Sequence, residues 1–303
     1  MSKIAKVSIS SFILFAIFSF LVSCKQPQKQ TDKQTVTGGK PTTSTSSAPQ
    51  AVTLTTSDGF TLAGTFVQAS SSGKTPACLL VHQLGKDKST YKSLQERLAA
   101  VGISSLAIDL RGHGESRTST AGTVDYRSFT DERQWIAMTA DLEAGLAYLR
   151  NHDAVDKTRI GIVGASIGAN LAVVVAADDR SKGEEPSITC LVLLSPGANY
   201  HGVKPHPRAR ELGRMPVLIV CGTRDSCYKD AQSLSNAARG GELVSFSGGA
   251  HGTDLFEADP TILDDTVRWI QANISASPAQ PPSPQPQESG VQGEGVSGES
   301  EGK

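Results

Sequence analysis

Large aromatic side chains are scarce in this chain of 303 residues, where phenylalanine, tryptophan and tyrosine together make up 5%. Four of the nine phenylalanines fall within residues 1–23, which leaves the rest of the chain poorer still. A binding site built on aromatic platforms, as for extended sugars, is therefore disfavoured. The chain also lacks an excess of charge of one sign, since its formal net charge is -1. This charge gives no reason to expect a nucleic acid partner.

Cysteine is scarcer still, with five residues, and no grouping of histidine, cysteine and aspartate has the spacing of a metal site. We therefore expect no metal and no cofactor. Cys78, Cys190 and Cys221 lie in predicted buried strands, where cysteine behaves as a small hydrophobic residue. The predicted strands bring no two of them together, and with Cys227 included we expect no disulfide.

The two ends of the chain account for its low hydrophobic content of 38% and its low charged content of 19%. Residues 1–23 have the form of a secretory signal, because Lys3 and Lys6 precede a short apolar run. The run ends in LVSC at residues 21–24, which resembles a bacterial lipobox. That resemblance implies cleavage before Cys24, lipid on Cys24, and an extracytoplasmic protein anchored to a membrane. A transmembrane anchor is the alternative, although the run is short for a span of about 20 residues.

Residues 24–50 are polar and residues 275–303 are rich in Pro, Ser, Gly and Glu, so we expect a flexible tether and a disordered tail. Residues 51–274 form one predicted domain, in which apolar strands alternate with helical stretches. The alternation implies right-handed crossovers, and near-continuous Val/Ile/Leu runs indicate strands buried on both faces. We predict a doubly wound, mostly parallel α/β sheet of eight strands. One long amphipathic helix is expected over residues 130–151.

Residues that can act as a nucleophile, an acid or a base follow three of the predicted strands. The strand at residues 159–165 runs into GASIG at 164–168, a G-x-S-x-G turn that exposes Ser166 at its tip. The following strands lead to Asp225 and to His251, and function collects at the carboxyl ends of such strands. Asp230 and Asp254 are the alternatives for the acid.

Ser166, Asp225 and His251 stand in the chain order of the α/β-hydrolase triad. Residues 79–85 (LLVHQLG) look like that family's oxyanion-hole segment, and residues 109–116 (DLRGHGES) look like its D-x-R-G-H-G-x-S segment. The domain therefore resembles the α/β-hydrolase superfamily over about residues 50–274.

The resemblance implies an oxyanion hole made by the backbone amides of Leu84 and Ile167. The chain departs from the family at Gln83, where glycine is usual. His82 and His113 are expected to be structural. Only about twenty residues separate the strand that ends near Ser195 from the strand that starts near Met215. This segment is too short for a large cap domain, so we expect an open site.

A serine hydroxyl needs a base within hydrogen-bond reach, and an acid must orient that base. The residues therefore predict hydrolysis of small carboxylic esters, with thioesters and amides as further substrates, through an acyl-enzyme on Ser166. The alternatives are a serine peptidase of the same superfamily and a non-catalytic surface lipoprotein that keeps the fold for binding. A dinucleotide loop is excluded, because the glycine spacing is not G-x-G-x-x-G.

Overall fold

A ten-stranded sheet forms the centre of the domain in the computed structural model, which describes residues 47–182, 187–274 and 302. The strands are β1 Gln50–Thr55, β2 Phe60–Val67, β3 Thr75–Val81, β4 Ser104–Ile108, β5 Thr118–Ser119, β6 Gly122–Thr123, β7 Val155–Ala165, β8 Ile188–Leu194, β9 Val217–Gly222 and β10 Gly241–Phe246. All eight expected strands are present, and the two-residue strands β5 and β6 bring the number to ten. The predicted signal peptide, Cys24, most of the tether and nearly all of the tail lie outside the described residues.

The strands follow the order β10-β9-β8-β7-β3-β4-β2-β5-β6, with β1 paired to β2. The six strands from β10 to β4 are parallel, whereas β2 is antiparallel to β4 and to β1. After β3 the chain adds β4 on one side of it, and it then adds β7, β8, β9 and β10 in turn on the other side. Ligand sites in doubly wound sheets gather at such a switch point, which here lies between β3 and β7.

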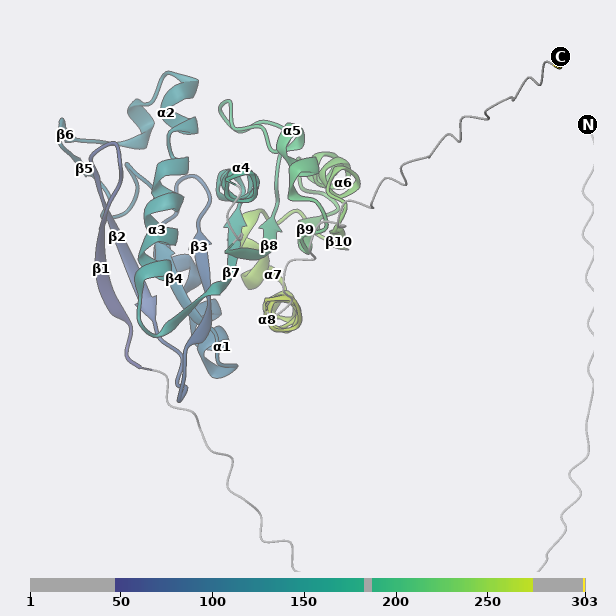
Figure 1. Cartoon of the computed structure of the whole chain (residues 1–303). Helices are drawn as coiled ribbons and strands as arrows, with labels where there is room; N and C mark the ends of the chain where they lie inside the picture. The colour runs from purple at the N-terminus through teal and green to yellow at the C-terminus, as the bar shows by residue number, and fades with distance from the viewer. Residues whose placement is uncertain (1–46, 183–186, 275–301, 303) are drawn as a thin grey trace, which may run out of the picture. The chain divides into compact units, whose positions relative to one another are not determined.

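Helices cover both faces of the sheet (Figure 1). The helices are α1 Lys92–Ala100, α2 Glu132–Ile136, α3 Thr139–Asn151, α4 Ile167–Ser181, α5 His206–Ala209, α6 Tyr228–Ala237, α7 Leu255–Ala258 and α8 Pro260–Asn273, with 3-10 turns η1 Lys88–Tyr91, η2 Tyr126–Ser128, η3 Arg210–Leu212 and η4 Gly252–Asp254. Within the described residues, none of these helices is long and apolar enough to cross a membrane.

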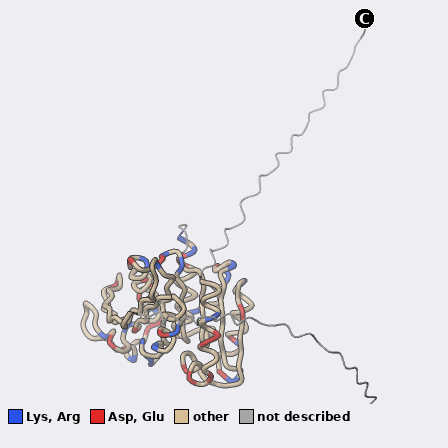
Figure 2. The backbone as a smooth tube through the Cα atoms, turned by 90° about the horizontal axis from the view of Figure 1, so that it is seen from below, with Lys and Arg blue, Asp and Glu red and all other residues tan. Residues whose placement is uncertain are grey.

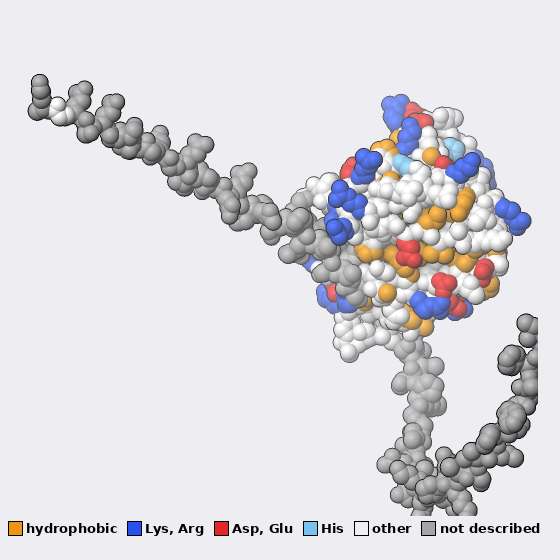
Figure 3. All heavy atoms as spheres, turned by 90° about the vertical axis from the view of Figure 1, so that its right-hand side faces the viewer, with side chains coloured by type: hydrophobic (Ala, Val, Ile, Leu, Met, Phe, Trp, Pro, Cys, Tyr) orange, Lys and Arg blue, Asp and Glu red, His pale blue; other side chains and the backbone are white. Residues whose placement is uncertain are grey.

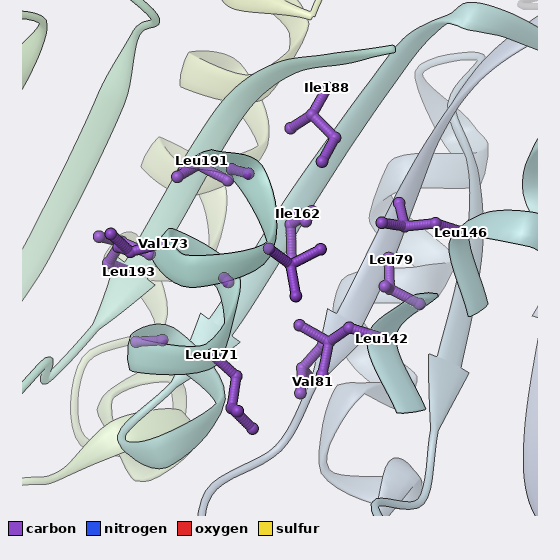
Figure 4. Close-up of a cluster of buried hydrophobic side chains, with 14 of the residues drawn as sticks. Leu79, Val81, Leu142, Leu146, Ile162, Leu171, Val173, Ile188, Leu191 and Leu193 are labelled. Atoms are coloured by element: carbon purple, nitrogen blue, oxygen red, sulfur yellow. The ribbon is translucent and has the colours of Figure 1, made fainter. Parts of the chain in front are cut away.

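Two apolar layers hold the helices, one on each face of the sheet. Successive side chains of a strand point to opposite faces. In β3, Leu79 and Val81 therefore join α3 and α4 in one layer, while Cys78 and Leu80 join α1 and α8 in the other. Figure 4 shows the first layer, in which side chains of α3 and α4 lie against the strands.

The expectation of one continuous helix over residues 130–151 is wrong. Helix α2 ends at Ile136 and α3 begins at Thr139. Asp131 starts α2 with a capping box, and the backbone around Met138 then makes tighter i to i+3 bonds. Such a turn redirects the chain, which lets the short α2 and the longer α3 pack separately.

Residues 109–116 form a turn that braces the end of β4. The buried Asp109 carboxylate accepts bonds from the backbone and the ammonium group of Lys88. The buried Arg111 pairs with Asp141 at 2.7 Å. Removing one partner of a buried ion pair leaves the other charge uncompensated, so Arg111 and Asp141 depend on each other to hold this segment.

Charged residues of both signs are interspersed over the domain (Figure 2). Figure 3 looks onto the side of β10 and α6, where hydrophobic side chains are scattered among charged ones. Strand β10 is the edge of the sheet, and its Val244 is 41% exposed. Scattered apolar residues of this kind are ordinary on protein surfaces and mark no binding site by themselves.

Candidate active site

Ser166 occupies the turn between β7 and α4, at the switch point of the sheet. Its φ of 53° and ψ of -116° lie in a region that residues other than glycine rarely adopt. Gly164 and Gly168 make room for this turn. A Cβ on Gly164 would lie 2.4 Å from the oxygen of Gly168, and one on Gly168 would lie 2.4 Å from the oxygen of Val81. The glycines thus let α4 pack directly on the end of β3 and hold the serine in a strained position.

Asp225 and His251 follow the neighbouring parallel strands β9 and β10, so both reach the edge of the sheet where Ser166 lies. His251 Nδ1 donates to Asp225 Oδ2 at 2.9 Å. This bond fixes the tautomer in which Nε2 can accept a proton. The alternative carboxylates are engaged elsewhere, because Asp230 accepts a bond from a backbone amide and Asp254 pairs with a lysine.

Tyr200 contacts two of the three residues. Its hydroxyl lies against the hydroxyl of Ser166 and donates to the Ser195 carbonyl at 3.3 Å. Its ring meets the ring of His251 edge-on, with centroids 6.4 Å apart. Among the described residues, no hydrogen bond joins Ser166 to His251. Bonds of this kind are often long in unliganded enzymes and shorten when substrate binds.

The surroundings of the acid–base pair make His251 a strong base. Contacts with the Cys227 thiol and with the Asp225 carboxylate raise the pKa of His251 to about 9, against the effect of burial. Burial raises the pKa of Asp225, but bonds from Ser195 and His251 outweigh it and hold that pKa below its ordinary value. Asp225 is therefore ionised at neutral pH and stabilises the protonated imidazole.

Ser195, at the end of β8, links the acid to the loop of the base. Its hydroxyl bonds to the Asp225 carboxylate and accepts a bond from the Gly252 amide at 3.0 Å. The residue is fully buried and has a φ of 52°. The sequence marks only the end of a strand here, so this positioning role was not predictable from the motif.

The backbone amides of Leu84 and Ile167 have no hydrogen-bond acceptor in the part of the chain that the structure describes. Free amides of this kind can receive the charge of an oxyanion. The Gln83 side chain holds the Leu84 loop, because its Oε1 accepts bonds from the Thr253 amide at 3.1 Å and the Thr253 hydroxyl at 2.9 Å. Its Nε2 donates to the carbonyl of His251 at 3.3 Å. Gln83, which stands where glycine is usual, therefore ties the loop of Leu84 to the loop of His251.

His82 and His113 are structural, as expected. His82 is fully buried, its Nδ1 donates to the Gln83 carbonyl at 2.8 Å and its Nε2 accepts from the Leu110 amide at 3.0 Å. The buried His113 stacks on Tyr126 with centroids 3.8 Å apart. Burial lowers the pKa of both imidazoles, so both are neutral.

Comparison with known proteins finds a family match over part of the chain. Residues 74–214 match a family model described as serine aminopeptidase, S33. The uncharacterized protein Rv2307c of Mycobacterium tuberculosis is 28% identical over 238 residues, which span 71% of this chain and 75% of that protein. The matched family and the similar solved structures are α/β hydrolases, and the domain has the α/β-hydrolase fold.

Solved α/β hydrolases share the fold. GrgF from Penicillium sp. sh18 superposes with a TM-score of 0.61 at 16% identity, covering 76% of this chain and 100% of GrgF. The Pyrococcus furiosus esterase Pf2001 gives a TM-score of 0.58 at 19% identity, covering 75% of this chain and 93% of the esterase. At these identities the likeness concerns the fold alone.

No large cap is inserted between β8 and β9, where the described chain holds only α5, η3 and connecting loops. Asn170 of α4 fastens this segment. Its Nδ2 donates to the carbonyls of Gly197 at 3.0 Å and Val203 at 2.8 Å. Within the segment, His201 stacks on Trp135 with centroids 4.1 Å apart, a pair that no sequence motif marks.

The four cysteines of the described residues are free thiols, but two of them lie in contact. The Sγ atoms of Cys221 and Cys227 lie 3.5 Å apart, because the loop after β9 turns back onto the strand before α6 begins. Ligand atoms of these two cysteines and of Asp225 all lie within 4.8 Å of one another. In the described residues this is the one cluster that could hold a metal ion, but His251 and Ser195 already occupy the carboxylate.

Proposed function

We propose that this α/β hydrolase cleaves carboxylic esters through an acyl-enzyme on Ser166. The observation that carries the proposal is the 2.9 Å bond between His251 Nδ1 and Asp225 Oδ2 beside a strained serine. The free amides of Leu84 and Ile167 add the donors that a tetrahedral intermediate requires.

The reaction begins when the hydroxyl of Ser166 turns from Tyr200 to His251. The serine oxygen attacks the ester carbonyl while Nε2 of His251 takes the hydroxyl proton, and Asp225 stabilises the imidazolium. The oxyanion is held by two backbone amides. The intermediate collapses, His251 returns its proton to the leaving alcohol, and water then releases the acid from the acyl-enzyme by the same route.

A serine peptidase is the second candidate, because the matched family model is described as a serine aminopeptidase. The same groups can cleave an amide if His251 protonates the departing amine. We favour esters because an alcohol is the easier leaving group, and because the similar Pyrococcus furiosus protein is described as an esterase.

We further propose that the hydrolase acts outside the cytoplasm, held at a membrane by lipid on Cys24. This proposal rests on LVSC at residues 21–24, which follows a short apolar run and the basic residues Lys3 and Lys6. Its substrates are then small esters that reach the site from outside the cell membrane, and no nucleic acid is involved.

A fluorophosphonate probe tests the mechanism, because it reacts covalently with an activated serine. Wild type and the surface variant Ser128→Ala should label fully, and Ser166→Ala should not label. Equal labelling of wild type and Ser166→Ala would overturn the mechanism. Absence of labelling in wild type would instead favour a non-catalytic binding protein. Comparing a p-nitrophenyl ester with an aminoacyl p-nitroanilide then ranks esterase against peptidase.

A further inference from the structure

We propose that Cys221 and Cys227 are a redox modification site, and that a reversible disulfide between them lowers the activity of the hydrolase. The bond itself follows from the positions of the two cysteines. Its effect on activity rests on the proposed function.

The two thiols are already in contact, with their Sγ atoms 3.5 Å apart. Cys221 lies in β9, Cys227 precedes α6, and the short loop between them carries Asp225. A disulfide requires an S–S distance of about 2.05 Å, so the sulfur atoms must approach by roughly 1.5 Å. Side-chain rotation together with a small adjustment of the loop supplies a movement of this size.

The other two cysteines of the described chain provide a contrast. Cys78 in β3 and Cys190 in β8 are both in register with Gly161 of β7, which lies between them. Strands two apart are separated by roughly 9.5 Å, whereas the Cα atoms of a disulfide lie within about 7 Å. Cys78 and Cys190 therefore cannot bond without movement of the sheet, and they serve as an internal control.

The oxidant that the step needs is a small disulfide. The thiolate of Cys227, which is 4% exposed beside the site, attacks one sulfur of the oxidant and releases one thiol. The thiolate of Cys221 then attacks Sγ of Cys227 and releases the second thiol. The protein loses two electrons and two protons, and the oxidant is reduced to two thiols. The contact with Cys221 and burial both raise the pKa of Cys227, so the first attack is slow and accelerates with pH.

The position of Cys227 explains why the bond affects catalysis. Its thiol contacts the His251 ring and the Tyr200 hydroxyl, and its backbone amide donates to Asp225 Oδ1 at 3.3 Å. Drawing Sγ toward Cys221 withdraws the thiol from the base and disturbs the amide that holds the acid. Because a misplacement of about 1 Å can cost about a hundredfold in rate, we expect kcat to fall at least about tenfold.

The test treats the folded wild type with 2,2′-dithiodipyridine and measures three quantities: thiopyridone released, disulfide peptides by mass spectrometry, and ester hydrolysis. We expect two thiopyridones per chain, a Cys221–Cys227 peptide without retained pyridine, and a fall in kcat that dithiothreitol reverses. Cys78→Ala should behave like wild type. In Cys221→Ser, a stable mixed disulfide should replace the internal bond.

The outcomes separate the two proposals. Free thiols at both positions after oxidation would overturn the modification site, as would a complete Cys221–Cys227 disulfide without any change in kcat. A reduced protein that hydrolyses no ester and fails to label with fluorophosphonate would overturn the proposed function instead. The peptide map decides on the bond in either case.

Discussion

The hydroxyl of Ser195 lies 3.0 Å from the backbone nitrogen of Gly252, the residue that follows the proposed base. The same hydroxyl bonds to the carboxylate of Asp225, so one buried side chain holds both members of the acid–base pair. Ser195→Ala leaves the amide without its acceptor and lets the imidazole tilt. We expect kcat to fall about tenfold with little change in KM, because orientation is lost and binding is not.

Steady-state kinetics on a p-nitrophenyl ester measure this effect, and Ser128→Ala on the surface is the matched control. The pH profile separates a positioning role from a structural one, since loss of the bond to Asp225 should also move the acid limb. An unchanged kcat in a folded Ser195→Ala variant contradicts the role.

The dependence of the rate on pH follows from the raised pKa of His251. The base must be neutral to accept a proton, and a pKa of about 9 keeps it mostly protonated at neutral pH. We therefore expect kcat/KM to rise with pH and to level off above about 9.

Cys227→Ala removes the contact that raises the pKa of His251 most. The midpoint of the pH profile of this variant should therefore move down toward the ordinary value of 6.5. Initial rates from about pH 5 to about pH 10, corrected for spontaneous hydrolysis, give both midpoints. A wild-type midpoint near 6.5 would refute the expectation.

Gly168→Ala tests the packing of the elbow. The new Cβ would lie 2.4 Å from the backbone oxygen of Val81, which cannot move without displacing β3. We expect the free energy of unfolding to fall by at least about 2 kcal/mol, measured by urea denaturation. Gly73→Ala is the control, because nothing lies within 4 Å of its added Cβ. Equal stability of the two variants would contradict the close packing of residue 168 against Val81.

Gln83→Leu keeps the size of the side chain but removes the acceptor for the amide and hydroxyl of Thr253. Leaving such buried donors unpaired costs about 1–3 kcal/mol. We expect this loss of stability together with a several-fold lower kcat, because the Leu84 loop is no longer tied to His251. Gln232→Leu, on the exposed face of α6, should change neither quantity. A normal kcat in Gln83→Leu would remove this loop from the account of catalysis.

Cys24→Ser tests the membrane anchor. Without the thiol no lipid can be attached, so the protein should leave the membrane fraction, and metabolic labelling with palmitate should disappear. Cys78→Ala, which changes a cysteine in the sheet, should still sediment with membranes. Sedimentation of Cys24→Ser with membranes would argue for a transmembrane anchor instead.

Much of the fold could be predicted, because its determinants are local. Continuous apolar runs define buried strands, and a parallel sheet places their carboxyl ends at one edge. That geometry brings Ser166, Asp225 and His251 to the same edge of the sheet whatever the loops do in detail. The sequence could not show the break between α2 and α3, because the apolar periodicity continues across Met138.

The contacts that tune the site were not predictable. Ser195, Gln83 and Cys227 touch the acid–base pair through side chains that come from three different strand ends. Their partners depend on where each loop folds back, and no short motif encodes that. In the sequence, Gln83 stands out only as a departure from the usual glycine, because its bonds to Thr253 depend on how both loops fold.

Asn170 binds the segment after β8 to the helix that begins beside Ser166, through bonds to Gly197 and Val203. The segment after β8 and the helix that carries the nucleophile turn are thus tied together by one buried side chain. Entry of substrate and exit of product then require no gate to swing open, and we expect turnover to be limited by acylation or deacylation. Solvent viscosity should accordingly leave kcat nearly unchanged.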